Sequence, residues 1–263
     1  MLICLLLERG TPPRLNPIVV DLIQRLERRG AAVTIWYPEQ DLIRLDTLAI
    51  TADLYLLKSD TELALSLANA LEGMGARILN RARASSVVRE KPTVAARLLA
   101  EGLPVPRSWI AERPAALAPM LERGSLILKP HRGYHGAGVL VAPNAAALPP
   151  AETYPEILFA QAYLGGSVRD LKLFVVGEQV FAVRRKFAQD SFLDAGTPIA
   201  LSPELEVLAR RCGEIFGLEL YGIDVLEVDG TYYVVDVNYF PGYRGVPNAA
   251  GVLADYIFNS LGG

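Results

Sequence analysis

Short apolar runs and amphipathic segments alternate through the first 80 residues, and this order constrains the fold more than any other feature of the chain. Apolar residues at Ile18, Leu22, Ile23 and Leu26 form one helical face that ends before Gly30. We expect strands and helices in turn over residues 2–7, 16–29, 32–37, 53–57, 61–74 and 77–80. Strands joined through a helix pair in parallel, so the pattern predicts a small α/β lobe around a largely parallel sheet.

A helical stretch at 85–102 follows, and we expect it to break or restart at Pro92. Pro104 and Pro106 then predict an extended connector, because proline disfavours helix at the preceding residue. Beyond the connector we expect strands at 126–129, 139–141, 158–163, 171–176, 179–185, 222–227 and 231–238, and helices at 203–216 and 249–261. The Ala/Pro-rich segment 142–155 indicates a surface loop with a short helix.

Composition excludes several classes of protein. Hydrophobic residues make up 51% of the 263 residues, so the chain can bury a large core and is not disordered. The net charge is −3 and no basic run is interleaved with aromatic residues, so we expect no nucleic-acid partner. Cys4 and Cys212 are too few for a disulfide scaffold or a Cys-rich zinc site. Because the apolar run at 2–7 lacks a basic flank and no 18-residue uncharged apolar stretch exists, we expect a cytoplasmic protein without a membrane span.

A glycine-rich loop between two apolar runs is the first chemical signal. Gly133, Gly136 and Gly138 give the spacing G-x-x-G-x-G, which matches neither a P-loop nor the dinucleotide-binding fingerprint. Glycines let backbone N–H groups approach phosphate oxygens closely, and Lys129 before the loop would add a point charge. The alternative is an ordinary hairpin with a flexible tip.

Acidic residues interrupt an apolar hairpin near the C-terminus. Asp236 and Asn238 are two apart and therefore share one face of a strand, and Asp224 lies in the partner strand. Such oxygen ligands suit Mg²⁺ shared with substrate phosphates. A plain two-residue turn at Asp229-Gly230 would pair Asp224 with Val235 and turn it away from Asp236. Convergence therefore requires an odd loop length or a bulge, and Gly230 could supply a bulge. The alternative is the exposed face of a half-buried hairpin.

Taken in order along residues 85–250, these motifs resemble the ATP-grasp superfamily. The resemblance implies that Lys91 and Lys129 contact ATP phosphates and that the loop Gly133–Gly138 covers them. It also implies that Gln161, Ala162, Tyr163 and Leu164 form the hinge that holds adenine, and that Asp224, Asp236 and Asn238 bind two Mg²⁺ ions. Two departures are Pro92 directly after Lys91, and Asp236 where typical members have Glu.

The basic hairpin at 169–186 resembles the RimK-like branch of that superfamily. Lys172 stands where the branch often has Arg, and Arg184, Arg185 and Lys186 form a basic cluster at a strand end. The resemblance implies a carboxylate–amine ligase in which Lys172, Arg184 and Arg185 are catalytic, while Arg169 and Lys186 contact an anionic substrate. The segment 187–200 lacks the Asn-containing stretch with a terminal Gly pair that such ligases usually carry.

An inositol-phosphate kinase is the alternative, because the segment 235–247 resembles inositol trisphosphate kinases. Two short N-terminal matches, at 14–16 and 57–60, point the same way. Substrate contacts expected from either branch are Arg14, Lys58, Arg169, Lys186, Asn238, Gly242 and Arg244. Arg244 replaces an acidic residue common in the kinases. A non-enzymatic ATP-binding protein is disfavoured, because the lysine and metal set is complete.

These inferences predict an α/β ATP-grasp fold with three lobes. We expect a small N-terminal α/β lobe over residues 1–83, like those that precede ATP-grasp domains, and two α+β lobes that clasp ATP, over 84–160 and 161–263. We expect ATP and Mg²⁺ as cofactors and a small anionic acceptor, in an ATP-dependent ligase acting through an acyl phosphate. The sequence leaves the oligomeric state open, a homo-oligomer included.

Overall fold

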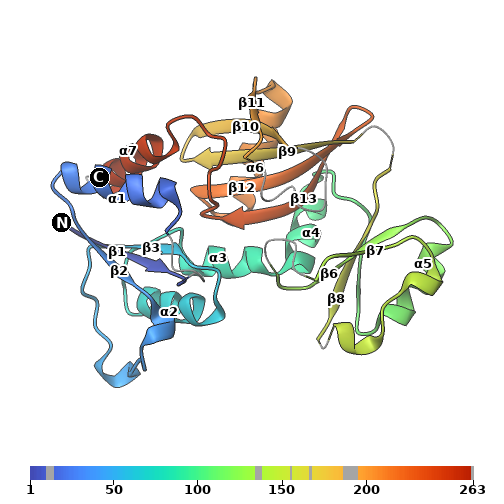
Figure 1. The fold of residues 1–263 in the computed structure, drawn as a ribbon, viewed down its shortest axis with the longest axis horizontal. Coiled ribbons are helices and arrows are strands. Elements are labelled where there is room, and N and C mark those ends of the chain that lie inside the picture. Colours follow the sequence, from blue (N-terminus) through green and yellow to red (C-terminus); the bar gives the residue numbers. More distant parts are fainter. Residues whose placement is uncertain (10–14, 134–137, 155, 166–167, 186–194, 262–263) are drawn as a thin grey trace.

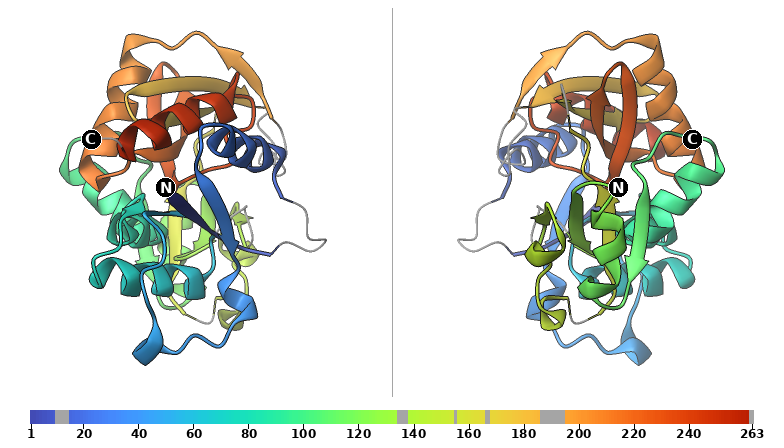
Figure 2. Two further views of the ribbon diagram at one scale, coloured as in Figure 1. Left: turned by 90° about the vertical axis from the view of Figure 1, so that its left-hand side faces the viewer. Right: turned by 90° about the vertical axis from the view of Figure 1, so that its right-hand side faces the viewer.

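Three β-sheets organise the computed structural model, which describes residues 1–9, 15–133, 138–154, 156–165, 168–185 and 195–261 (Figure 1). The sheets follow one another along the chain in the order of the three predicted lobes. The N-terminal sheet faces the viewer in the left-hand view of Figure 2, and the central sheet does so in the right-hand view. The C-terminal sheet lies above both.

The N-terminal sheet is parallel, as the alternation of strands and helices predicts. Its strands are β1 (Leu2–Leu7), β2 (Ala32–Trp36), β3 (Leu54–Lys58) and β4 (Ile78–Leu79), in the order β2-β1-β3-β4. The helices are α1 (Pro17–Arg28) and α2 (Glu62–Gly73), with single 3₁₀ turns η1 (Pro38–Gln40) and η2 (Leu45–Thr47). Helix α1 begins at Pro17 behind the cap Asn16, whose side chain accepts a hydrogen bond from the Ile18 N–H.

Two helices take the place of the predicted stretch at 85–102. They are α3 (Ala82–Arg89) and α4 (Lys91–Ala100), so the chain breaks at Glu90 and the helical region begins three residues earlier than predicted. The break confirms the expected restart near Pro92. Pro92 is tolerated there because the first turn of a helix needs no N–H donor.

The central sheet is antiparallel and has a small core of its own. Its strands are β5 (Ser108–Ala111), β6 (Leu126–Pro130), β7 (Leu140–Ala142) and β8 (Leu158–Ala162), in the order β5-β8-β6-β7. Short helical segments beside it are η3 (Pro114–Leu117), α5 (Ala118–Leu121), η4 (Ala145–Ala147) and η5 (Ala151–Thr153). The core includes Leu121, Leu128 and Leu158.

The C-terminal sheet carries the longest strands. It contains β9 (Val168–Val176), β10 (Gln179–Arg185), β11 (Thr197–Ile199), β12 (Leu220–Val228) and β13 (Thr231–Tyr239), in the order β11-β10-β9-β12-β13. Helices α6 (Pro203–Phe216) and α7 (Ala249–Leu261) both contact β9, and α7 also packs against α1. The short strands β5 and β11 are not predicted from the sequence, because each has only three or four residues and is defined by its partner strand.

A β-bulge brings the two hairpin carboxylates together. Val228 pairs with Thr231 and Val225 with Val234, but Asp224 pairs with Asp236, so Val235 is the extra residue. The predicted convergence of Asp224 and Asp236 is confirmed. The position suggested for the bulge is wrong: the turn at Gly230 is regular, and the irregularity lies in β13.

The N-terminal and C-terminal lobes share one continuous hydrophobic core, which includes Leu5, Leu56, Leu173 and Leu253. A buried amide ties them further, because Asn80 accepts hydrogen bonds from the N–H groups of Glu219 and Leu220 and donates to the Leu220 carbonyl. The central lobe has a second, smaller core and joins this unit near α4 (Figure 1) and through Phe159 of β8, which belongs to the shared core.

Candidate active site

A cavity of about 720 Å³ lies where the three sheets meet. The N-terminal lobe contributes Asn16, Lys58 and Asp60 to its wall, and helices α3 and α4 contribute Arg89 and Lys91. The central lobe supplies the wall around β6 and β8, and the C-terminal sheet forms the broad polar floor.

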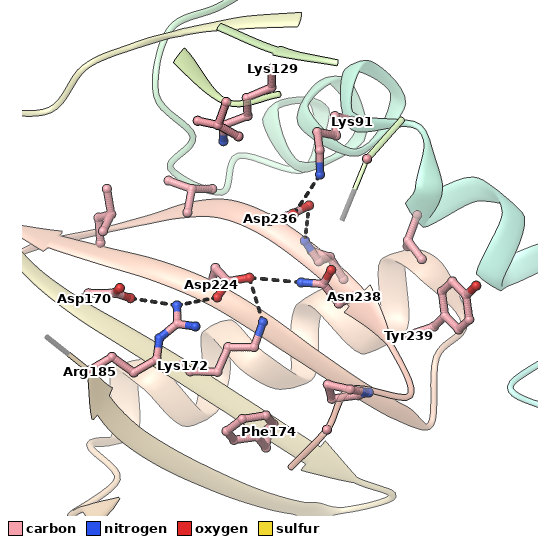
Figure 3. Close-up of a pocket in the computed structure, with 18 of the residues that line it drawn as sticks. Lys91, Lys129, Asp170, Lys172, Phe174, Arg185, Asp224, Asp236, Asn238 and Tyr239 are labelled. Carbon is pink, nitrogen blue, oxygen red and sulfur yellow. Dashed lines mark hydrogen bonds and ion pairs between the residues drawn. The ribbon is translucent and has the colours of Figure 1, made fainter. Parts of the chain in front are cut away.

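The floor is one face of the C-terminal sheet, on which charged and amide side chains alternate with the buried apolar residues of the other face (Figure 3). These side chains belong to Asp170, Lys172, Arg185, Asp224, Asp236 and Asn238. Strand pairing sets them side by side, because Lys172 lies opposite Asp224 and Arg185 opposite Asp170. Gly222 leaves room here, since a Cβ on it would lie 3.0 Å from the Lys172 side chain.

Asp224 is the centre of this network. Lys172 Nζ donates to Asp224 Oδ2 at 2.6 Å, Arg185 Nη2 to Oδ1 at 2.6 Å, and Asn238 Nδ2 to Oδ2 at 3.0 Å. Burial by itself would raise the pKa of Asp224, but the charges and hydrogen bonds of Lys172 and Arg185 outweigh it and hold that pKa below its usual value. Asp224 is therefore ionised at neutral pH. Arg185 also donates to Asp170 Oδ1 at 2.9 Å.

Lys91 reaches the same face from the start of α4. Its Nζ lies 2.8 Å from Asp236 Oδ2, and Asp236 Oδ1 accepts the N–H of Val237 at 3.0 Å. The break between α3 and α4 places Lys91 at the first position of a helix, where its backbone N–H also donates to the His131 carbonyl. The helix start thus contacts both the sheet and the loop after β6.

Lys129 approaches from the central lobe. Its Nζ donates to Gln161 Oε1 at 2.7 Å, and Gln161 in β8 is only 2% exposed. Burial lowers the pKa of Lys129 to about 8, a shift that the charge of Asp236 reduces and that of Lys91 deepens. Figure 3 shows Lys91 and Lys129 on the side of the cavity that faces the carboxylates of the sheet.

The oxygen donors on the floor fit Mg²⁺. Asp224 and Asp236 lie directly opposite each other in the strand ladder, and Asn238 is two residues along on the same face. Mg²⁺ takes few protein oxygens and completes its shell with water and phosphate, so two carboxylates and an amide are sufficient. In the part of the chain that the structure describes, no larger cluster of His, Cys, Asp or Glu gathers as for a metal ion.

Six of the remaining predicted site residues also line the cavity. Those that do are Gly133, Ala162, Leu164, Lys58, Gly242 and Arg244. Three predicted residues, Arg14, Gly136 and Lys186, lie outside the described residues.

Four predicted residues that the structure describes do not line the cavity. Arg184 points away from the floor, because it alternates with Arg185 in β10 and is exposed. Arg169 is exposed at 3.3 Å from Glu227. Tyr163 is 38% exposed, and Gly138 forms the end of the loop, packed against Pro130.

Sequence reasoning missed Asp170 and Asp60. Asp170 is buried and lies two residues before Lys172, so strand alternation was a usable signal for it. Asp60 follows β3 at the carboxyl edge of the parallel sheet, the edge at which such sheets commonly bind ligands.

Comparisons with known proteins agree on one family. A sequence profile described as the RimK-like ATP-grasp domain matches residues 88–259. The probable alpha-L-glutamate ligase of Saccharophagus degradans is 29% identical over 195 residues, which cover 68% of this chain and 64% of that protein. The crystal structure of a RimK domain ATP-grasp protein from Sphaerobacter thermophilus DSM 20745 has a TM-score of 0.77 at 22% identity, covering 98% of this chain and 100% of that one.

The ATP-grasp ligase PsnB, in a complex with a minimal precursor, Mg and ADP, has a TM-score of 0.73 at 22% identity and covers 98% of this chain and 97% of that one. The predicted ATP-grasp fold and its RimK-like branch are confirmed by these matches. The protein from Saccharophagus degradans and PsnB are both named ligases. The resemblance to inositol trisphosphate kinases stays a prediction. Among the helices of the described residues, none is long and apolar enough to cross a membrane.

Proposed function

Because the chain belongs to the RimK-like ATP-grasp family, we propose that it is an ATP- and Mg²⁺-dependent carboxylate–amine ligase. In this reaction ATP phosphorylates a substrate carboxylate, and an amine then attacks the acyl phosphate. The observation that carries the proposal is the cavity itself, in which two lysines from outside the C-terminal sheet face a floor of alternating carboxylates and cations. Such a site acts by positioning and charge neutralisation more than by covalent chemistry.

In the proposed complex, adenine lies toward Gln161–Leu164 and the triphosphate lies over the floor. Lys91 and Lys129 then contact phosphates, and the Gly133–Gly138 loop covers them. Lys91 already spans the distance to Asp236, and Lys129 lies beside Gln161, which supports this orientation.

Lys172 and Arg185 are the proposed catalytic cations. Both are bound to Asp224, which holds their side chains over the floor with little freedom. They would stabilise the negative charge of the transferring phosphoryl group. Arg184 was predicted to share this role and is now proposed only as a surface residue, because it is exposed on β10.

Asp224, Asp236 and Asn238 are the proposed ligands of two Mg²⁺ ions. When bound, these ions would neutralise the phosphate charge and orient the γ-phosphate. The residues that hold them also hold Lys91, Lys172 and Arg185 by ion pairs, so the same carboxylates organise the metal ligands and the cations.

Trapping with hydroxylamine tests the proposed chemistry. Hydroxylamine converts an acyl phosphate into a stable hydroxamate, so purified protein with ATP and Mg²⁺ should form hydroxamates from one class of carboxylate. L-glutamate and glutamate-ending peptides lead the panel, because the relative from Saccharophagus degradans is named a probable alpha-L-glutamate ligase. Lys172→Met serves as the inactive control.

The same preparation distinguishes the ligase from the alternative, an inositol-phosphate kinase. In a kinase, Lys58 and Arg244 in the cavity wall would contact the phosphates of the acceptor. With γ-labelled ATP, stable label on an inositol phosphate would replace the ligase proposal by a kinase. Hydroxamate from a carboxylate, without label transfer to an inositol phosphate, would support the ligase.

A further inference from the structure

Charged side chains on the N-terminal side of the cavity differ from those on the floor. On the floor, Asp170, Asp224 and Asp236 each form an ion pair with a lysine or arginine. Asp60, by contrast, lines the same cavity but makes no hydrogen bond or ion pair with any residue that the structure describes. It is therefore a carboxylate of the cavity wall to which none of the described lysines and arginines is bound.

The backbone fixes Asp60 in relation to the reaction centre. It follows β3 at the carboxyl edge of the parallel sheet, next to Ser59, which is fully buried. Tyr239 Oη donates to the Ser59 carbonyl at 2.7 Å, and Tyr239 directly follows Asn238 in β13. The segment that carries Asp60 is thus tied to the strand that carries Asp236 and Asn238.

The segment after β13 closes the other side of this part of the cavity. Lys58 lies with its Nζ 6.0 Å from the centre of the Phe240 ring, and a Cβ on Gly242 would lie 3.3 Å from Asn16 Nδ2. The N-terminal lobe and the segment 239–244 therefore approach each other closely, and both line the cavity beside the metal-binding face. A small acceptor between them would lie between Asp60 and the floor.

We propose that Asp60 binds the protonated amine of the acceptor and takes its proton before attack. The proposal rests on the ligase function above, and it places the binding site for the attacking amine at the N-terminal lobe. An amine is mostly an ammonium ion at neutral pH and cannot attack until it loses a proton. Among the described residues that line the cavity, Asp60 is the carboxylate that no lysine or arginine pairs with, and it is therefore suited to bind that ammonium.

The step balances as follows for an acceptor R–NH₃⁺. One proton passes from the ammonium to the Asp60 carboxylate, and the free nitrogen lone pair forms the C–N bond with the acyl phosphate carbon. The C–O bond to the phosphoryl group breaks, and phosphate leaves with that electron pair. The second nitrogen proton goes to the departing phosphate, and Asp60 later returns its proton to water.

Two nucleophiles of similar size and different charge test this role. Near neutral pH ammonia is mostly NH₄⁺, whereas hydroxylamine is mostly uncharged and needs no base. Asp60→Asn should lower the rate of amide formation from ammonium or from L-glutamate by about 10²-fold, while hydroxamate formation stays within a few-fold of the unsubstituted protein. Asp46→Asn makes the same charge change at an exposed site paired with Arg44 and should alter neither rate.

The outcomes separate the two proposals. If Asp60→Asn lowered the rates with both nucleophiles equally, Asp60 would be a structural residue or would act on the carboxylate substrate. If neither rate changed, Asp60 would have no part in the reaction. Hydroxamate formation by the unsubstituted protein without any product from ammonium or L-glutamate would also overturn the role of Asp60. No hydroxamate from any carboxylate would instead overturn the ligase function itself.

Discussion

At the scale of single residues, the two facing aspartates have unlike surroundings. Asp224 forms ion pairs with two cations, Lys172 and Arg185, whereas Asp236 pairs with one among the described residues, Lys91. The pKa of Asp224 lies below its ordinary value, so its stabilising contribution is complete at neutral pH and is lost as the pH falls through that depressed pKa. Removing its charge takes the ion-pair partner from Lys172 and leaves Arg185 with Asp170, so two mostly buried cations lose a counter-ion that they share.

Asn substitutions at the two positions should therefore separate stability from activity. Asp224→Asn is expected to lower the free energy of unfolding by about 3 kcal/mol and to abolish turnover. Asp236→Asn should abolish Mg²⁺-dependent turnover while leaving the fold largely intact, because one ion pair is lost. Denaturant unfolding and ADP release measure the two effects. Unchanged turnover in Asp236→Asn would contradict the metal assignment.

Lys129 should make nucleotide binding depend on pH. With a pKa of about 8 caused by burial, Lys129 loses its charge as the pH rises through that value, and a neutral lysine cannot neutralise a phosphate. If only the protonated form binds well, ATP affinity should fall roughly tenfold by about pH 9. Titration with a fluorescent ATP analogue measures this. Lys129→Arg should remove this decline, and an unaltered decline in that variant would assign it to another group.

At the scale of the elements, helix α6 packs so close to β12 that it requires a glycine in mid-helix. A Cβ on Gly213 would lie 2.2 Å from the Tyr221 hydroxyl, which donates to the Ala209 carbonyl. Alanine has the higher helix propensity, by about 1 kcal/mol, but the steric clash and the disturbed hydrogen bond act in the opposite direction.

Gly213→Ala should lower the free energy of unfolding by about 1–3 kcal/mol, because overpacking outweighs propensity. Gly73→Ala is the matched control: Gly73 ends α2, has open space around its Cβ position, and should be neutral or slightly stabilising. Chemical denaturation of both variants makes the comparison. A stabilised Gly213→Ala would mean that α6 moves away from β12 without cost.

Local patterns predicted most elements of this fold. Helix α1 is a clear case, because its apolar period and its Asn16 cap lie within a few residues of each other. The bulge at Val235 was beyond such patterns, since an extra residue in β13 is defined only by its pairing with β12. The place of Asp60 in the cavity wall was also beyond local patterns, because the cavity includes residues almost 180 positions away, among them Tyr239.

At the scale of the whole molecule, the central lobe stands apart from the other two. Its core, around Leu121, Leu128 and Leu158, is separate from the core shared by the N-terminal and C-terminal lobes. Lys129 and Gln161 belong to this lobe, whereas the proposed metal ligands belong to the C-terminal sheet. ATP bound between them would link two bodies that otherwise have little common core.

Nucleotide should therefore protect the central lobe most strongly against hydrogen exchange. We expect ATP with Mg²⁺ to slow amide exchange in β6 and β8 more than in β1 and β3, whose hydrogen bonds lie inside the shared core. Hydrogen–deuterium exchange with mass spectrometry measures this by segment, and Lys129→Met should reduce the effect. Equal protection of all three sheets would contradict the independence of the central lobe.

The shared core also bears on how the chain folds during synthesis. Helix α1 is synthesised before α7, yet the two helices pack together although about 220 residues separate them. The central lobe draws its core from residues 117–160 and can close early. We expect part of the apolar surface of the N-terminal lobe to stay uncovered until α7 is synthesised, and such exposed apolar surface on a partly folded chain is what chaperones bind.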